Sequence, residues 1–144
     1  MIKEKYTNIT NSTNASMEEN KVVSFDKINH IETSFRVHQD GFVGIHYQQG
    51  KIEDEEGFKK AEINLKLKRP YPFELEKGVR SSDKTEKPFD NKQILDAAKK
   101  VLNYLHKKYP DYTFGGNVSS CFWEERMENS CGMDFHCKDA NSSI

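Results

Sequence analysis

Histidine and arginine residues in the first third of the chain could support acid–base chemistry. Residues 31–38, IETSFRVH, and 42–48, FVGIHYQ, alternate between apolar and polar side chains, as strands with one buried face do. If the two strands pair through a three-residue loop, Arg36, His38 and His46 lie on one polar face. A histidine that moves a proton beside an arginine that binds an anion could serve a phosphodiester reaction. These three residues are our catalytic and binding candidates, and a plain solvated sheet face is the alternative.

The turn between these two strands decides which side chains share a face. A two-residue Asp-Gly turn would place Val37 opposite Gly44, so that the apolar residues of the two strands lie on opposite faces. A three-residue loop over residues 39–41 would instead pair Val37 with Val43. Because register should follow the buried face, the sequence predicts the three-residue loop.

Basic residues elsewhere could bind nucleic acid. The candidate binding residues outside the histidine face are Lys66, Lys68, Arg69 and Arg80. A basic groove interleaved with aromatic side chains would suit a single strand. Acidic residues are interspersed with these cations, however, and the formal net charge of −1 argues against a broad basic surface.

All three cysteines lie in one segment, CFWEERMENSCGMDFHC, residues 121–137. The segment lacks the close cysteine pair that structural zinc sites commonly contain, so we expect no metal and no cofactor. A hairpin centred on Asn129 would place Cys121 opposite Cys137 on an apolar face and leave Cys131 near the turn. We expect buried free thiols, with a Cys121–Cys137 disulfide as the alternative.

One amphipathic helix is expected over about residues 90–109. Asp90 is the predicted N-cap and Gln93 completes a capping box. The expected buried stripe consists of Ile94, Ala98, Val101 and Leu105, widened by Leu95 and Leu102. Pro110 ends the helix.

The remaining segments complete an α+β prediction. Residues 1–20 contain few apolar side chains and are expected to form a disordered tail, and residues 139–144 a short C-terminal tail. Residues 21–138 would form a single domain, with a third strand at 61–68 and a polar loop at 76–88. The expected sheet is mainly antiparallel and five- to six-stranded, in the order β-β-β-(β)-α-β-β, with the helix packed on one face.

The sequence carries no complete catalytic motif, so we lean toward a binding protein rather than an enzyme. Without an apolar leader or spanning segment, a soluble cytoplasmic protein that does not contact membranes is expected. The leading interpretation is a small regulatory module that binds a protein partner. One expected example of such a module is a phage or mobile-element accessory protein that inhibits a defence factor in the cytoplasm of its host. The alternatives are a phosphodiester or nucleic-acid-processing enzyme that uses the Arg36, His38 and His46 face, and a nucleic-acid-binding protein.

Overall fold

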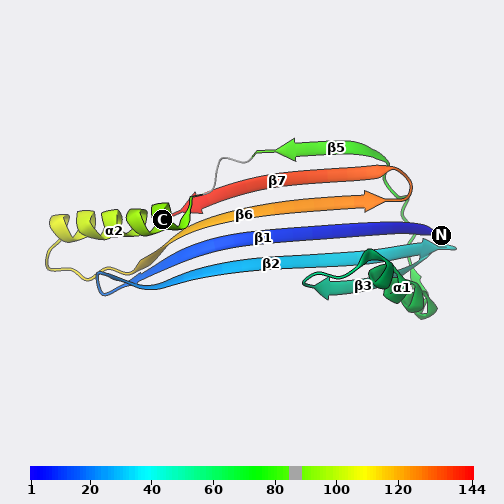
Figure 1. Ribbon diagram of the computed structural model, residues 1–144, viewed down its shortest axis with the longest axis horizontal. Helices are drawn as coiled ribbons and strands as arrows, with labels where there is room; N and C mark the ends of the chain where they lie inside the picture. Colours follow the sequence, from blue (N-terminus) through cyan, green and yellow to red (C-terminus); the bar gives the residue numbers. More distant parts are fainter. Residues whose placement is uncertain (85–88) are drawn as a thin grey trace. The chain divides into compact units, whose positions relative to one another are not determined.

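The computed structural model of the protein describes residues 1–84 and 89–144, and its strands form one mixed sheet. In chain order the elements are β1 (Ile2–Glu18), β2 (Lys21–Gln39), β3 (Phe42–Gln49), α1 (Asp54–Asn64), the 3-10 helix η1 (Leu65–Leu67), β4 (Arg69–Pro70), β5 (Gly78–Asp83), α2 (Asn91–Lys108), β6 (Gly116–Asn129) and β7 (Met133–Ser143). The seven strands follow the order β4-β3-β2-β1-β6-β7-β5 (Figure 1). The predicted α+β class is confirmed, but the sheet is larger than expected and there are two α-helices among the described residues.

Contacts divide the chain into two compact units. Unit 1 comprises residues 1–9, 30–83 and 124–138, and unit 2 comprises residues 10–29, 84–123 and 139–144. Strands β1, β2, β6 and β7 each contribute residues to both units. The single domain expected over residues 21–138 stays a prediction.

The two expected tails are wrong, because both segments belong to strands. β1 spans Ile2–Glu18, and β7 continues to Ser143. The polar side chains of these segments find partners on neighbouring strands: the Tyr6 hydroxyl donates to Glu125, and the Ser119 and Ser143 hydroxyls lie 2.8 Å apart. Hydrogen bonds and backbone pairing therefore order segments whose apolar content is low.

Unit 1 has its core between β2 and α1. Phe35, Val37 and Ala61 are completely buried there, and Phe58 packs edge-on against Phe35. The sequence predicts a strand at 61–68 in this region, and that prediction is wrong. The acidic residues 54–56 occupy the first turn of α1, where their negative charges stabilise the partial positive charge of the helix N-terminus. Ile63 and Leu67, two of the apolar residues of this segment, are more than half exposed.

Two glycines allow α1 to approach the sheet closely. A Cβ atom on Gly44 of β3 would lie 2.1 Å from the backbone oxygen of Ala61, and one on Gly57 of α1 would lie 2.4 Å from the Phe35 ring. Neither position has room for even a methyl group. β3 therefore meets the backbone of α1 directly at Gly44, and α1 meets the Phe35 ring of β2 directly at Gly57.

The register between β2 and β3 differs from the predicted one. Val37 pairs with Gly44 and Phe35 pairs with His46, so the strands are joined by the two-residue turn Asp40–Gly41. Both turn residues have positive φ, 52° and 78°, as the tight turns that match strand twist require. The predicted three-residue loop is wrong because Val37 is buried even though its partner on β3, Gly44, has no side chain. Gly44 leaves space that the backbone of α1 fills.

Unit 2 has its core between α2 and the sheet. Ile94, Ala98 and Leu102, spaced four residues apart, are buried with Ala15, Met17 and Val118. The predicted capping box is confirmed: the Gln93 amide donates to the Asp90 carboxylate, and the Asp90 amide donates to the Gln93 side chain, both at 2.8 Å.

The polar segment expected as a loop at 76–88 contains a strand. β5 runs parallel to β7, pairing Gly78 with Met133 and Asp83 with Lys138. Residues 85–88 of the predicted loop lie outside the described residues. The sheet therefore ends in a parallel pair rather than being antiparallel throughout.

The packing of α1 on β3 predicts that Gly44→Ala destabilises the protein. The added methyl group would clash with the backbone of α1, which cannot adopt another rotamer as a side chain can. We expect a loss of about 1–3 kcal/mol in the free energy of unfolding, the usual range for overpacking. Urea unfolding monitored by circular dichroism measures the change. Gly116→Ala is the matched control, since its Cβ would find only ordinary contact with Met17 at 3.6 Å. Equal stability of the two variants would contradict the close approach.

The contact between β1 and β6 predicts an unusual tyrosine titration. Burial and the hydrogen bond to Glu125 raise the pKa of Tyr6 to about 12. Glu125→Gln should lower this pKa toward 10 without reaching it, since burial remains. NMR titration of the tyrosine ring carbons, with Tyr6→Phe to assign the signal, measures the shift. A pKa of Tyr6 near 10 in the unmodified protein would rule out the contact.

Candidate functional site

A buried carboxylate joins two of the predicted site residues in unit 1. Glu4 on β1 is only 2% exposed, and the Arg36 guanidinium of β2 donates to it at 3.1 Å. The His38 Nε2 atom lies 3.9 Å from the same carboxylate oxygen, beyond hydrogen-bond distance. Arg36 and His38 lie two residues apart on one strand face, so both reach the same side of β1.

His38 is the most unusual polar residue of this group. Its side chain is 8% exposed, and neither ring nitrogen has a hydrogen-bond partner among residues 1–84 and 89–144. Burial lowers the pKa of His38 below 6.5; nearby Glu4 opposes this shift and Arg36 adds to it. At neutral pH the ring is therefore uncharged, with one nitrogen able to donate a hydrogen bond and the other able to accept one.

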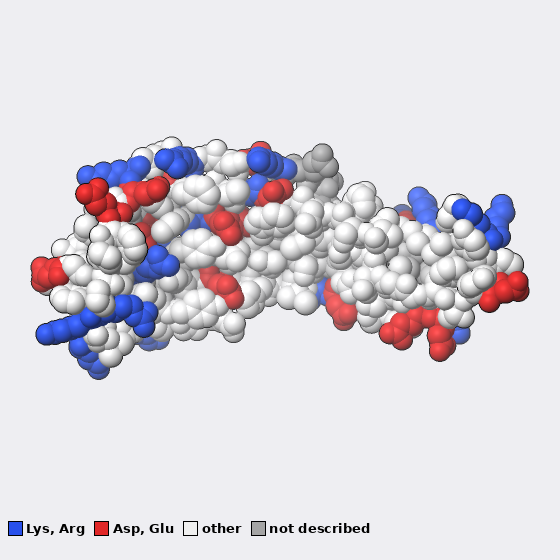
Figure 2. Space-filling model, turned by 180° about the vertical axis from the view of Figure 1, so that it is seen from behind, with Lys and Arg blue, Asp and Glu red and all other residues white. Residues whose placement is uncertain are grey.

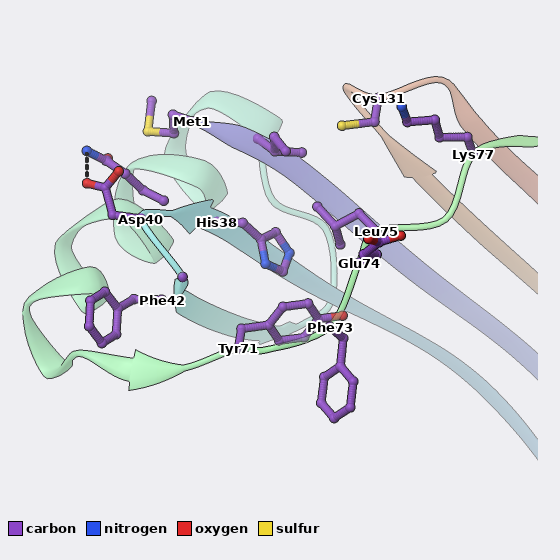
Figure 3. Close-up of a pocket in the computed structure, with 13 residues that line it drawn as sticks. Met1, His38, Asp40, Phe42, Tyr71, Phe73, Glu74, Leu75, Lys77 and Cys131 are labelled. Atoms are coloured by element: carbon purple, nitrogen blue, oxygen red, sulfur yellow. Dashed lines mark hydrogen bonds between the residues drawn. The ribbon is translucent and has the colours of Figure 1, made fainter.

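A cavity of about 600 Å³ opens beside His38, within the size range of small-molecule sites. The tip of the β2–β3 turn and the segment that follows β4 form much of its wall (Figure 3). It is lined by Met1, Ile2, His38, Gln39, Asp40, Gly41, Phe42, Tyr71, Phe73, Glu74, Leu75, Lys77 and Cys131. The Tyr71 ring packs edge-on against the His38 ring at a centroid distance of 4.6 Å, and the Tyr71 amide donates to the Gly41 carbonyl oxygen.

His46, the third catalytic candidate, lies on the opposite sheet face. Its register partner is Phe35, and the two rings stack at 6.4 Å on the side covered by α1. Residues directly opposite in a strand pair share a face, whereas Arg36 and His38 point the other way. The structure therefore brings Arg36 and His38 together around Glu4 and separates His46 from them.

The four basic candidates do not form one surface. Lys66 is in η1, Lys68 follows it in a left-handed conformation, and Arg69 is in β4. Arg80 is in β5, at the other end of the strand order. On the face shown in Figure 2, Lys and Arg atoms alternate with Asp and Glu atoms, and neither sign forms one continuous tract.

The cysteine segment forms the β6–β7 hairpin, but in a different register. Side-chain hydrogen bonds join Ser119 to Ser143 and Ser120 to Ser142, which places Asn141 rather than Cys137 across from Cys121. All three cysteines are free thiols. His136 contacts Glu124 at 2.7 Å. Among residues 1–84 and 89–144, no group of three or more His, Cys, Asp or Glu is placed to hold a metal ion.

Two residues of the site lie where sequence patterns offer little signal. Glu4 belongs to the segment that composition identifies as a tail, and Tyr71 lies between two prolines. Only the pairing of β1 with β2, across more than 30 residues of chain, brings Glu4 to Arg36. An isolated carboxylate in a polar segment does not reveal that partner.

Comparison with solved structures shows the fold class. The chain matches a proposed modulator of a DNA gyrase from Thermotoga maritima with a TM-score of 0.75 and 18% identity over 98% of this chain. TldE from Thermococcus kodakarensis matches with a TM-score of 0.74 and the same identity and coverage. A proposed modulator of DNA gyrase from Bacteroides thetaiotaomicron matches with 0.67 and 12% identity over 97% of this chain.

These matches extend over about a third of the neighbouring proteins: 34% of the Thermotoga and Thermococcus chains and 35% of the Bacteroides chain. No protein-family model and no curated protein sequence matches the chain. At such identities the likeness shows the fold alone.

The predicted function is contradicted by these neighbours. The sequence favoured a phage-type inhibitor of a host defence factor, whereas the fold is that of proposed gyrase modulators and TldE. No helix among the described residues is both long and apolar enough to cross a membrane.

The environment of His38 predicts a loss of stability in acid. Because the pKa of His38 is lower in the folded chain than its ordinary 6.5, the unfolded chain binds the proton more tightly. The free energy of unfolding should be highest above pH 6.5 and fall as the pH decreases toward the lowered pKa. Urea unfolding at a series of pH values measures this, and His38→Leu should flatten the dependence.

A His136→Gln variant is the control for this measurement. It removes a histidine that already contacts a carboxylate, and it should leave the contribution of His38 in place. If His38→Leu and the unmodified protein lose stability equally between pH 7 and pH 5, roughly the range of histidine titration, the buried neutral ring is disproved.

Proposed function

We propose that the chain is a module of the gyrase-modulator type, and that it acts by binding a protein, with a DNA gyrase as the first candidate. The observation that carries the proposal is the match of nearly the whole chain to three proteins, two of which are described as proposed gyrase modulators. Because the chain spans only a third of those proteins, the proposal concerns the module and not their complete activities.

The geometry of the sheet supports binding to a protein. β5 ends the strand order, so no further described strand lies beyond its outer edge. Five of its six residues are exposed, and Val79 is 79% exposed. An extended segment of a partner can pair with such an edge through backbone hydrogen bonds while alternate side chains provide specificity.

The placement of the histidines also supports a binding role over catalysis. The structure separates His46 from Arg36 and His38, so a general acid and a general base are not paired across one face. The Arg36 guanidinium already donates to the Glu4 carboxylate at 3.1 Å. Binding of a protein partner requires neither a paired general acid and general base nor an anion-binding arginine.

The test measures DNA supercoiling by purified DNA gyrase at increasing concentrations of this chain, alongside direct binding by biolayer interferometry. We expect binding and a concentration-dependent change in supercoiling. Val79→Asp should weaken both by introducing a desolvation penalty at the β5 edge.

The matched control is Val23→Asp, since Val23 is also an exposed strand valine, 53% exposed, but lies in unit 2 on β2. It should behave as the unmodified chain does. Absence of both binding and any supercoiling change would contradict the proposal. Binding that Val79→Asp leaves intact would reject the β5 edge as the contact.

A further inference from the structure

The outer side of α2 and the loop after it carry aromatic rings that the core of unit 2 does not bury. Leu102 belongs to the buried stripe of the helix, and Tyr104, two residues later, lies on the other side and is 61% exposed. Tyr109 and Tyr112, just beyond the helix, are also exposed and pack edge-on against each other. Tyrosine is enriched in protein–protein interfaces, where the ring is buried and the hydroxyl finds a partner. The exposed rings therefore indicate an interaction surface.

Lys108, the last residue of α2, lies between two of these rings. Its Nζ atom is 5.6 Å from the centre of the Tyr104 ring and 5.3 Å from the centre of the Tyr109 ring, and it donates to the Tyr104 hydroxyl at 3.4 Å. Because the Tyr104 oxygen accepts from the ammonium group, its own hydrogen can be donated to another group. Side chains of a helix lean toward its N-terminus, so these donors lie over the Tyr104 turn and not at the negative helix end.

The lysines around this pair of donors have no acidic partners. From Asn91 to Phe114 the chain has five lysines and two aspartates, whereas the formal net charge of the whole chain is −1. Lys100 and Lys107, four residues before and three residues after Tyr104, lie on the same side of the helix and are exposed. None of the ion pairs of residues 1–84 and 89–144 includes Lys100, Lys107 or Lys108. We call these three lysines and Tyr104 the α2 stripe.

The acidic side chains nearest in sequence flank the α2 stripe. Asp96 is one helical turn before Lys100, and Asp111 follows the helix. Two glutamates lie in residues 18–20, and this segment bonds to the loop at 112–114 through its asparagine side chain, beyond the end of α2. A short anionic segment therefore fits over the middle of the stripe, whereas a long polyanion would meet carboxylates at either end.

We propose that the α2 stripe binds an acidic segment of a partner protein, in which several carboxylate side chains flank an apolar residue. One carboxylate would accept from the Lys108 ammonium group and from the Tyr104 hydroxyl, and its neighbours would face the other two lysines. The apolar residue would pack on the exposed ring of Tyr112. The stripe belongs to unit 2 and the β5 edge to unit 1, so this inference does not depend on the gyrase-modulator proposal.

A single strand of nucleic acid is the other polyanion that lysines and aromatic rings can bind. It fits this surface less well, because bases stack on open ring faces and the Lys108 ammonium group already covers a face of both Tyr104 and Tyr109. A carboxylate needs only the donors at the ring edge.

The test titrates isotopically labelled full-length chain with three end-blocked peptides and follows the ring signals of Tyr104 by NMR, assigned with Tyr104→Phe. The peptides are Glu-Glu-Leu-Glu-Glu, Gln-Gln-Leu-Gln-Gln and Lys-Lys-Leu-Lys-Lys. We expect saturable shifts with the glutamate peptide and about tenfold weaker binding of the other two, as expected for loss of a charge-assisted hydrogen bond. Added salt should weaken the glutamate peptide, since the lysines are exposed. Equal binding of the glutamine peptide, or no shift with the glutamate peptide, overturns the proposal.

Two substitutions locate the binding. Lys108→Met removes the charge but keeps a long flexible side chain, and Tyr104→Phe keeps the ring but removes the hydroxyl. Each should weaken the glutamate peptide several-fold, followed for both variants by the Tyr112 ring signal. Lys92→Met is the matched control, because it removes another exposed lysine of α2 about 24 Å away along the helix axis, well beyond the screening length of about 8 Å at physiological salt. It should leave the affinity unchanged. Unchanged affinity in both Lys108→Met and Tyr104→Phe would overturn the proposal.

A thymidylate strand with four phosphates is the remaining probe, since it matches the four carboxylates of the glutamate peptide. Weaker binding of the strand than of the peptide supports an acidic protein segment as the ligand. Tighter binding of the strand would assign the surface to nucleic acid and overturn the proposal.

Discussion

The close approach of α1 to β3 is the constraint on which the rest of unit 1 depends. Gly44 faces the backbone of Ala61, and Gly57 lies under the Phe35 ring, so a side chain at either glycine would push the helix from the sheet. The face of β2 that packs beneath α1 is the apolar one. It holds Phe35 and Val37 beneath α1 and leaves the alternate residues, Arg36 and His38, to face the other side.

The polar side of β2 is organised by one carboxylate. Glu4 is almost completely buried and forms its 3.1 Å contact with Arg36 rather than with His38. Removing Arg36 would leave the buried Glu4 carboxylate without its partner, which is strongly destabilising. Burial lowers the pKa of His38, which lies at the wall of a cavity. Because Glu4 contacts Arg36 instead, the His38 ring has no hydrogen-bond partner among the described residues.

Local signals in the sequence predicted local structure well and long-range pairing poorly. The capping box of Asp90 and Gln93 located α2, because each partner lies within one helical turn. β1 was missed because few of its side chains are apolar, and because its contacts with β6 and the turn after it are distant in sequence: Tyr6 contacts Glu125, and Lys3 contacts Ser130. The β2–β3 register was wrong because strand alternation cannot show that a helix backbone fills the space above Gly44. His46 was assigned to the wrong face for the same reason, and the candidate site lost one of its three residues.

The wall of the cavity is attached to the sheet more loosely than the residues beneath it. β4 has only two residues and pairs with β3 at two positions, after which the Tyr71 amide donates to Gly41 at 2.8 Å. His38, by contrast, belongs to the 19-residue strand β2, where it is the penultimate residue and pairs with Val43. Segments with few backbone hydrogen bonds open at lower free energy than strand interiors. The segment that carries Tyr71 is therefore held to the sheet by fewer backbone hydrogen bonds than the strand that carries His38.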